Sequence, residues 1–391
     1  MNSIYLDCAA TTPMRPEVRE AMAPYDDQHF GNASSVHAWG RAARAALEEA
    51  RERVAAAIGA QRSEVVFVRG GTESDNLAVV GRVLADRAAG RPARVCTVET
   101  EHRAVLDTAR GATRFGAECT VLGVDAEGRL DLDELRAALA TGASVASIMW
   151  VNNETGVVHD LRAIAELAFE MGVCLHTDAV QALGKLPVRV DDVPVGLLSL
   201  SGHKIEGPKG AAALFVRSGV ELDGLLRGGG QEQGLRPGTP DVAGAVGLAT
   251  AVELAVAERS TTAERLGRLR DEFERRLCAA WPTAMLNGAR AVRAPHVSSV
   301  GFPDVDPDPL LPLLDLEGLA LSSGSACSSG SRTESHVLRA LHGDADIPAT
   351  LRFSFGRTTK AEEVPLAVER TVRALESLTS VASPAPGGSA A

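Results

Sequence analysis

An aspartate and a lysine, Asp178 and Lys204, each close an apolar run of the sequence and are separated by twenty-six positions. In an open α/β sheet, the carboxyl ends of neighbouring parallel strands meet at a ligand crevice, so residues distant in sequence can face one ligand there. One interpretation is a cofactor site in which Asp178 pairs with a ring cation and Lys204 condenses with a carbonyl group. The alternative is an ordinary ion pair beside a glycine turn. For these two residues alone, the ion pair is the commoner arrangement.

A glycine-containing segment at residues 69–80, RGGTESDNLAVV, directly follows the apolar run VVFV and opens a predicted helix. Backbone amides and the positive end of a helix dipole at Gly71 and Thr72 suit a phosphate group. The segment carries neither a Walker loop nor a dinucleotide fingerprint. Ser201 and His203 flank Gly202 next to Lys204 and offer two more donors to the same phosphate. The alternative for each of these residues is a helix cap or a turn.

Three further polar residues follow predicted strands or lie close behind them. His102 comes after ARVCTV, Asn153 after the run that ends in MWV, and Gln181 three residues beyond Asp178. A flat imidazole at His102 suits stacking on an aromatic cofactor, and the two amides suit a ring hydroxyl, although each residue could serve only a turn or helix start. Together with the acid, the amine and the phosphate donors, this set matches the requirements of pyridoxal 5′-phosphate, whose ring nitrogen stays protonated beside a carboxylate.

Composition narrows the class of protein. The chain has 391 residues, 45% hydrophobic and 23% charged, which is the balance of a globular protein large enough for two domains. A net charge of −11 argues against a protein that mainly coats nucleic acid or an anionic membrane. Six scattered cysteines show neither a CxxC pair nor a metal-ligand spacing, and no secretory signal or membrane-spanning run is evident. We therefore expect a cytoplasmic protein with no metal, no membrane contact and no direct nucleic-acid binding.

The pattern of apolar residues predicts the helices, strands and domains that position the candidate site residues. Residues 41–58 form an amphipathic helix, and strands alternate with helices from Glu64 onward, which is typical of a mostly parallel sheet covered by helices. Near residue 257 the chain becomes a charged helix with one apolar stripe, followed by mixed strands and helices of a smaller α+β domain. We expect a large cofactor-binding domain at 13–256, a small domain formed by 1–12 and 257–378, and a disordered tail at 379–391.

Nine ordered motifs within residues 4–378 resemble the cysteine desulfurase family, which belongs to aminotransferase class V among the fold-type I pyridoxal phosphate enzymes. They read LDCAATTP, GGTESDN, TEHRAVLDT, SIMWVNNETGVV, HTDAVQALGKLP, SGHKIEGPKG, RGGGQEQGLRPGT, SSGSACSSG and LRFSFGR. The resemblance implies a seven-stranded, mostly parallel sheet in the large domain, a small domain that carries a catalytic cysteine, and conversion of L-cysteine to L-alanine with sulfur left as an enzyme persulfide. The chain departs from the family at Cys8, Trp150 and Pro237.

Residue by residue, the resemblance implies Lys204 as the Schiff-base lysine, Asp178 as the partner of the ring nitrogen and His102 as the stacked ring. It also implies the remaining contacts of the cofactor and the substrate. The phosphate contacts are Gly71, Thr72, Ser201 and His203, the ring-oxygen contacts are Asn153 and Gln181, and the substrate-carboxylate contacts are Asn32 and Arg352. Thr239 would reach the phosphate in the partner subunit of a homodimer with shared sites.

Cys327 lies in SSGSACSSGSRTESH, a long run of small and polar residues that predicts a flexible loop with one exposed thiol. This context resembles the long-loop class of the family, which passes sulfur to scaffold or acceptor proteins. The activating group of Cys327 is not evident, although His102 is a candidate. The alternatives are a selenocysteine lyase or an aminotransferase on the same scaffold, or a partner protein that has lost the chemistry. Iron–sulfur assembly and thiolation of tRNA, cofactors or DNA remain open as destinations of the sulfur.

Overall fold

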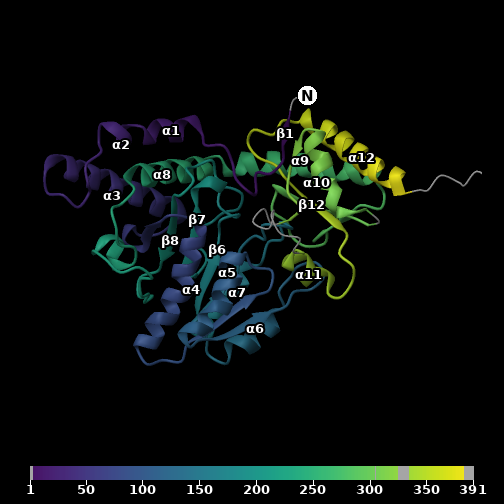
Figure 1. Ribbon diagram of the computed structural model, residues 1–391. Helices are drawn as coiled ribbons and strands as arrows, with labels where there is room; N and C mark the ends of the chain where they lie inside the picture. The colour runs from purple at the N-terminus through teal and green to yellow at the C-terminus, as the bar shows by residue number, and fades with distance from the viewer. Residues whose placement is uncertain (1–2, 304, 325–333, 383–391) are drawn as a thin grey trace, which may run out of the picture.

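The computed structural model describes residues 3–303, 305–324 and 334–382 and is built around a seven-stranded sheet (Figure 1). All neighbouring strands are parallel except for β8, which runs antiparallel to both of its neighbours. The strands in spatial order are β2 (Val65–Val68), β8 (Ala212–Val216), β7 (Leu197–Ser201), β6 (Cys174–Asp178), β5 (Val145–Ser147), β3 (Arg94–Val98) and β4 (Glu118–Leu122). The predicted mostly parallel, seven-stranded sheet is confirmed.

Helices cover both faces of this sheet because successive strand residues point to opposite faces. Val95 belongs to the apolar cluster on one face and Cys96 to the cluster on the other. The first face is covered by α4 (Gly71–Ala88) and α5 (Arg103–Gly111). The helices that contribute to the second cluster are α1 (Pro16–Met22), α3 (Ala38–Ile58), α6 (Leu132–Leu139), α7 (Leu161–Glu170) and α8 (Val242–Ala257). The sheet is thus buried on both sides, as its nearly continuous apolar strands require.

The helix α8 has no counterpart in the sequence-based prediction. Its sequence, VAGAVGLATAVELAVA, is apolar around most of its circumference, so it lacks the one-sided stripe that marks an amphipathic helix. It packs against α3 and against α1 (Pro16–Met22), which is followed by the short α2 (Pro24–Asp27). A helix buried among other helices carries little periodic signal, and this explains why the pattern did not predict it.

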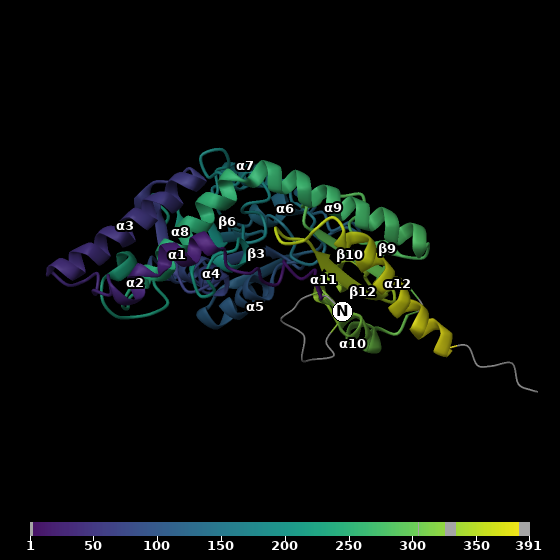
Figure 2. The ribbon, with the colours of Figure 1, turned by 90° about the horizontal axis from the view of Figure 1, so that it is seen from above.

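The second part of the chain combines the first residues with the last third. The antiparallel strands β10 (Val297–Phe302), β12 (Ala349–Ser354) and β9 (Met285–Leu286) form one sheet, and β1 (Ile4–Tyr5) pairs in parallel with β11 (Leu319–Ala320). Ile4 and Leu6 belong to the same apolar cluster as Phe273 and Phe353, whose ring centroids are 4.5 Å apart. The helices of this part are α9 (Arg259–Ala280), α10 (Pro307–Leu316), α11 (His336–His342) and α12 (Glu363–Ala382), as Figure 2 shows from above.

The predicted domain boundary near residue 257 falls at Glu258, between the end of α8 and the start of α9. The division into residues 13–256 and the remainder stays a prediction, and the predicted tail lies mostly outside the described residues. Across the described ranges, no helix is long and apolar enough to span a membrane.

A buried histidine joins three neighbouring strands directly beneath the end of β6. The two ring nitrogens of His176 bond to the hydroxyl of Ser147 on β5 at 2.8 Å and to that of Ser199 on β7 at 3.0 Å. Burial lowers the pKa of His176 from 6.5 to about 3, so the ring is neutral in the folded protein at pH 7. The unfolded chain therefore binds a proton here more readily than the folded chain does.

We expect this histidine to make the protein sensitive to acid. Its contribution to stability is complete above pH 6.5 and is lost as the pH falls toward 3, because the unfolded state takes up the proton first. Between pH 6.5 and 4.5 the loss amounts to about 2–3 kcal/mol for one such group. Urea unfolding of the wild type and of His176→Asn should show a smaller loss over this range in the variant. Equal losses in both proteins would contradict this account of His176.

Candidate active site

A cavity of about 200 Å³ lies at the carboxyl ends of the parallel strands and contains most of the predicted site residues. The predicted residues in its lining are Gly71, Thr72, His102, Asn153, Asp178, Gln181, Ser201, His203, Lys204 and Arg352. The others are Ala9, Ala10, Asp75, Met149, Val151 and Val180. The lining therefore joins segments that are more than three hundred positions apart in the chain.

The acid and the lysine enter this cavity from neighbouring strands. Asp178 is the last residue of β6, and Lys204 ends a short helical turn that follows β7. The Lys204 amine donates to the carbonyl oxygens of Ala9 at 2.6 Å and Ala10 at 2.8 Å, so the N-terminal segment holds its end. An Asp178 carboxylate oxygen accepts from the Val180 amide at 2.8 Å. Burial raises the pKa of Asp178, while the charges of His102 and Lys204 act in the opposite direction.

The start of α4 provides the predicted phosphate end of the cavity. A Cβ atom placed on Gly71 would lie 3.4 Å from a Val180 methyl carbon and 3.8 Å from Cβ of Ser201, so the first turn of α4 closely approaches the end of β7. Burial, supported by the nearby charge of Lys204, lowers the pKa of His203 to about 4. The neutral His203 ring bonds through Nδ1 to the Thr11 hydroxyl at 3.2 Å. Backbone amides, hydroxyl groups and a neutral imidazole thus gather at a helix N-terminus, which suits a phosphate.

The residues predicted to contact an aromatic ring are held by local bonds. His102 is the N-cap of α5, and its Nδ1 accepts from the Ala104 amide at 3.1 Å. Gln181 donates to the Ala9 carbonyl at 2.9 Å, and its side-chain oxygen bonds to His296 at 3.0 Å. The side-chain oxygen of Asn153 is buried and has no hydrogen-bond partner among the described residues. A buried acceptor without a partner is costly, so a donor from a bound group suits this position.

Arg352 is almost completely buried and is fixed by two partners that the sequence did not suggest. One terminal nitrogen donates to the Asn153 carbonyl at 2.9 Å, and the other donates to Asp7 at 2.8 Å. Its Nε is buried without a hydrogen-bond partner among the described residues. Because a guanidinium carries further N–H groups beyond these two bonds, it keeps the capacity to bind a carboxylate in the cavity.

Asp75 is a cavity residue that the sequence reasoning missed. It is buried on α4, and one carboxylate oxygen lies 3.7 Å from Nε2 of His176. Burial and the nearby Asp178 charge raise its pKa well above the usual value. Its spacing from Gly71, one helical turn along α4, was the available signal for its place on the cavity face.

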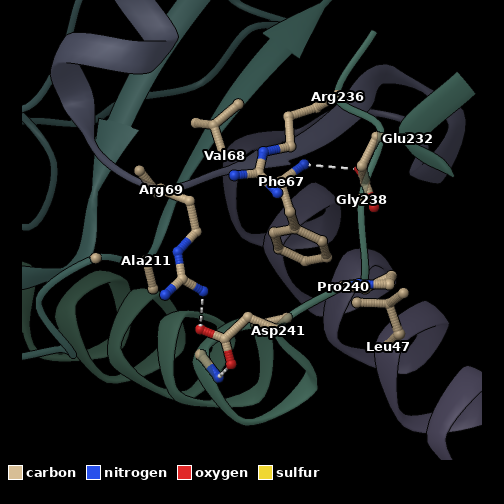
Figure 3. Close-up of a pocket in the computed structure, with 14 residues that line it drawn as sticks. Leu47, Phe67, Val68, Arg69, Ala211, Glu232, Arg236, Gly238, Pro240 and Asp241 are labelled. Atoms are coloured by element: carbon tan, nitrogen blue, oxygen red, sulfur yellow. Dashed lines mark hydrogen bonds and ion pairs between the residues drawn. The ribbon is translucent and has the colours of Figure 1, made fainter. Parts of the chain in front are cut away.

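Three predicted site residues are not brought into this cavity. Asn32 is exposed before α3, where its side-chain oxygen accepts from the Ser34 amide at 2.9 Å. Thr239 is exposed between Gly238 and Pro240, both of which line a separate pocket beside Arg69 and Arg236 (Figure 3). Cys327 lies outside the described residues. The roles of these three residues stay predictions.

The segment that carries Thr239 is anchored to its own chain by a buried ion pair. Glu232 accepts from Arg51 at 2.6 Å and 2.7 Å and from the Phe67 amide at 2.8 Å. Figure 3 shows Glu232 and Phe67 on the wall of the same pocket. Glu232 and Gln233 both have positive φ angles, 49° and 59°, which non-glycine residues rarely adopt. The ion pair therefore fixes an unusual bend close to Thr239.

Comparison with known proteins gives consistent matches over nearly the whole chain. The family model described as Aminotransferase class-V matches residues 4–366. The chain is 42% identical over 379 residues to a protein of Dictyoglomus turgidum named cysteine desulfurase IscS, covering 97% of this chain and 96% of that protein. Among solved structures, a NifS-like protein has a TM-score of 0.88 and 32% identity, covering 96% of this chain and 100% of its own. A structure titled SspA in complex with cysteine has a TM-score of 0.78 and 35% identity, covering 90% and 99%.

Gly70 and Gly71, at the start of α4, should differ in how much a valine substitution weakens cofactor binding. Gly71→Val places a branched side chain against Val180 and Ser201, so we expect it to weaken binding of pyridoxal 5′-phosphate by about tenfold or more. Gly70→Val is the control, because a Cβ there would meet no described atom within 4 Å and its φ of 168° is extended backbone. Titration of the cofactor-free chain, followed by absorbance, measures both affinities. Equal affinities would contradict the assignment of this turn as the phosphate site.

Proposed function

The chain belongs to the aminotransferase class V family and, within it, to the cysteine desulfurases, and we propose that its reaction takes place in the cavity around Lys204. Cysteine desulfurases convert L-cysteine to L-alanine and leave the sulfur on the enzyme as a persulfide. The observation that carries the proposal is the convergence of ten predicted site residues on one cavity at the strand ends.

Pyridoxal 5′-phosphate is the proposed cofactor, and the donor set of the cavity fits it. When bound, it supplies an electron sink that makes the α-proton and the C–S bond of cysteine labile. The phosphate would be held by the first turn of α4, at Gly71 and Thr72, together with Ser201 and His203. Asp178 would keep a proton on the ring nitrogen, and the partnerless oxygen of Asn153 would accept a hydrogen bond from the ring hydroxyl group. Gln181 would contact the same ring oxygen, and His102 would stack on the ring.

Lys204 has two proposed tasks. Its amine would hold the cofactor in the cavity, and its Nζ would accept the α-proton of L-cysteine. Its two backbone contacts at Ala9 and Ala10 hold the amine at the cavity wall, where such a transfer needs it. Arg352 binds the substrate carboxylate through N–H groups that remain after its bonds to Asp7 and Asn153. The contribution of Asn32 to the carboxylate stays a prediction.

Cys327 is the proposed sulfur acceptor. Its thiolate attacks the sulfur of the substrate, so an S–S bond forms while the C–S bond breaks, and the electron pair of that bond stays with the carbon. Protonation of this carbon and return of the α-proton complete L-alanine. The persulfide sulfur on Cys327 then passes to an acceptor or scaffold protein. The candidate destinations are iron–sulfur cluster assembly and the thiolation of tRNA, cofactors or DNA.

Two substitutions should separate the cofactor role from the sulfur role. We expect Lys204→Ala to lose the visible absorbance band of the lysine-bound cofactor together with alanine production. Cys327→Ala should keep that band but lose the persulfide and reduce catalytic desulfuration at least about 100-fold. Absorbance spectra and assays for alanine and sulfide with L-cysteine measure these outcomes. Full desulfuration by Cys327→Ala would exclude the persulfide route.

We also propose that the enzyme is a homodimer. Three large apolar side chains near the start of α3 are exposed, with fractions of 68% for Phe30, 87% for Val36 and 57% for Trp39. Such a cluster favours an interface, since apolar surface gains stability when it leaves water. Thr239 is exposed as well and would reach the phosphate site of the partner subunit. A cytoplasmic location is proposed because a protein persulfide and six scattered cysteines suit a reducing compartment.

A charge within this apolar cluster should disrupt the dimer. We expect a Val36→Asp, Trp39→Asp double variant to elute as a monomer and to lose most desulfurase activity, because Thr239 no longer completes the partner's site. Phe169→Asp is the matched control, since Phe169 is 75% exposed on α7, away from α3 in the sequence. Size-exclusion chromatography with light scattering measures the mass of each variant. A monomeric wild type, or a fully active monomeric variant, would contradict the shared site.

A further inference from the structure

The side-chain amide of Gln181 lies between two groups that decide which way it faces. Its nitrogen donates to the Ala9 carbonyl at 2.9 Å, and its oxygen bonds to Nε2 of His296 at 3.0 Å. A carbonyl oxygen can only accept, so the nitrogen of Gln181 has to face Ala9 and its oxygen has to face His296. Nε2 of His296 is therefore the protonated ring nitrogen and donates to Gln181.

The surroundings of His296 keep its ring neutral. The side chain is 1% exposed, and burial together with nearby positive charges lowers its pKa well below the usual value. The nearby charges are those of Lys185, Arg352, Arg270 and Lys204. A neutral imidazole carries one N–H, and Nδ1 has no hydrogen-bond partner among the described residues. The single proton of the ring is thus committed to the bond with Gln181.

The small antiparallel sheet of the second part of the chain positions both partners of Gln181. At the start of β10, the His296 carbonyl accepts from the Phe355 amide at 2.9 Å. At the end of β12, the Ser354 hydroxyl accepts from the Ala9 amide at 2.9 Å. Gln181 itself belongs to the turn that follows β6 in the large sheet. One part of the chain therefore places this side chain in the cavity, and the other part orients it.

The orientation of Gln181 decides what it can offer to a bound ring. An amide group carries two N–H bonds, and one of them is used by Ala9, so the other can serve the cavity that Gln181 lines. The oxygen of Asn153 is a buried acceptor in the same cavity. A ring hydroxyl has one proton to donate. If Asn153 accepts that proton, the ring oxygen can bond to Gln181 only by accepting from its N–H.

We propose that His296 is a positioning residue for the cofactor, because its bond to Gln181 keeps the N–H groups of that amide toward Ala9 and the cavity. His296 is not among the described residues that line the catalytic cavity, so it acts through Gln181 and without contact to the ring. Without this donor the Gln181 oxygen would be a buried acceptor lacking a partner, which favours a turned amide. The inference rests on the proposed function, in which Gln181 contacts the ring oxygen of pyridoxal 5′-phosphate.

The first experiment removes the donor and then restores it. His296→Phe fills the space of the ring without an N–H, so we expect the affinity of the cofactor-free chain for pyridoxal 5′-phosphate to fall about tenfold. His296→Gln again presents an N–H toward Gln181 and should stay within about threefold of wild type. Titration followed by absorbance measures the affinities, and circular dichroism of each cofactor-free variant verifies the fold.

The matched control is a second buried histidine that lies outside the cavity lining. His159 is 5% exposed, burial lowers its pKa to about 4, and its Nε2 has no hydrogen-bond partner among the described residues. It therefore shares the burial of His296 but makes no bond through Nε2 to a cavity residue. We expect His159→Phe to leave the affinity for pyridoxal 5′-phosphate within about twofold of wild type.

A double-mutant cycle separates positioning from general support of the fold. Gln181→Ala removes the amide on which His296 acts, and we expect it to weaken binding of pyridoxal 5′-phosphate about tenfold or more. Adding His296→Phe to Gln181→Ala should then change the affinity by less than about twofold, because the effect of His296 passes through Gln181. A full further loss in the double variant would show that His296 acts elsewhere and would overturn the proposal.

The tautomer of His296 can be measured in the wild-type protein, so this test does not depend on the folding of any variant. In the cofactor-free protein at pH 7, nitrogen NMR of the histidine rings should show a proton on Nε2 of His296 and none on Nδ1. The signals are assigned by their loss in His296→Gln. A proton on Nδ1, or on both nitrogens, would contradict the orientation inferred for Gln181.

The outcomes distinguish this inference from the proposed function. If wild type does not bind pyridoxal 5′-phosphate, or binds it without a visible band that depends on Lys204, the proposed function fails. If wild type binds the cofactor in this way and His296→Phe binds it equally well, the positioning role of His296 is wrong. Equal losses in His296→Phe and His296→Gln would also overturn it, because the N–H donor would then not matter.

Discussion

The parallel pairing of β6 with β7 is the constraint on which the site depends. The register places Asp178 opposite Ser199, so the two strands end at the same edge of the sheet and the chain beyond Ser201 carries Lys204 to the same cavity. An antiparallel pair would send the two strand ends to opposite edges. His176 stabilises this pairing, because its neutral ring bonds to a hydroxyl group on β7 and also to one on β5, the other neighbour of β6. The acid and the amine therefore share a cavity through backbone pairing and need no direct contact with each other.

The N-terminal segment connects the second part of the chain to this cavity. It begins as β1, paired with β11, and then runs past the strand ends. Asp7 bonds to Arg352, Ala9 accepts from both Gln181 and Lys204, and Thr11 bonds to His203. These contacts join the predicted substrate, ring and phosphate groups through one short stretch of chain. A change in the position of this stretch would therefore affect the predicted substrate, ring and phosphate contacts together.

Burial gives the cavity its electrostatic character. It raises the pKa values of Asp75, Asp178 and Glu154 and lowers that of His203. Each of these groups is thereby biased toward its neutral form, since charge is costly away from water. A positively charged ring nitrogen near Asp178 would reverse the bias there and favour the carboxylate. Arg352 differs from these groups, because its buried charge is already compensated by Asp7. Perturbed pKa values of this kind are common in catalytic cavities.

The sequence by itself determined the alternating strands and helices, the mostly parallel sheet and nine of the residues that line the cavity, because strand periodicity and the chemistry of each side chain are local properties. The tenth, Arg352, followed only from the family resemblance of its motif. The sequence could not reveal α8, whose uniformly apolar surface lacks a stripe, nor the partners Asp7 and His296, which come from distant segments. Only the tertiary structure brought Asp75 beside His176 and placed the amide of Gln181 between His296 and Ala9. Such contacts depend on how strands and loops pack in three dimensions, and no spacing within one segment encodes them.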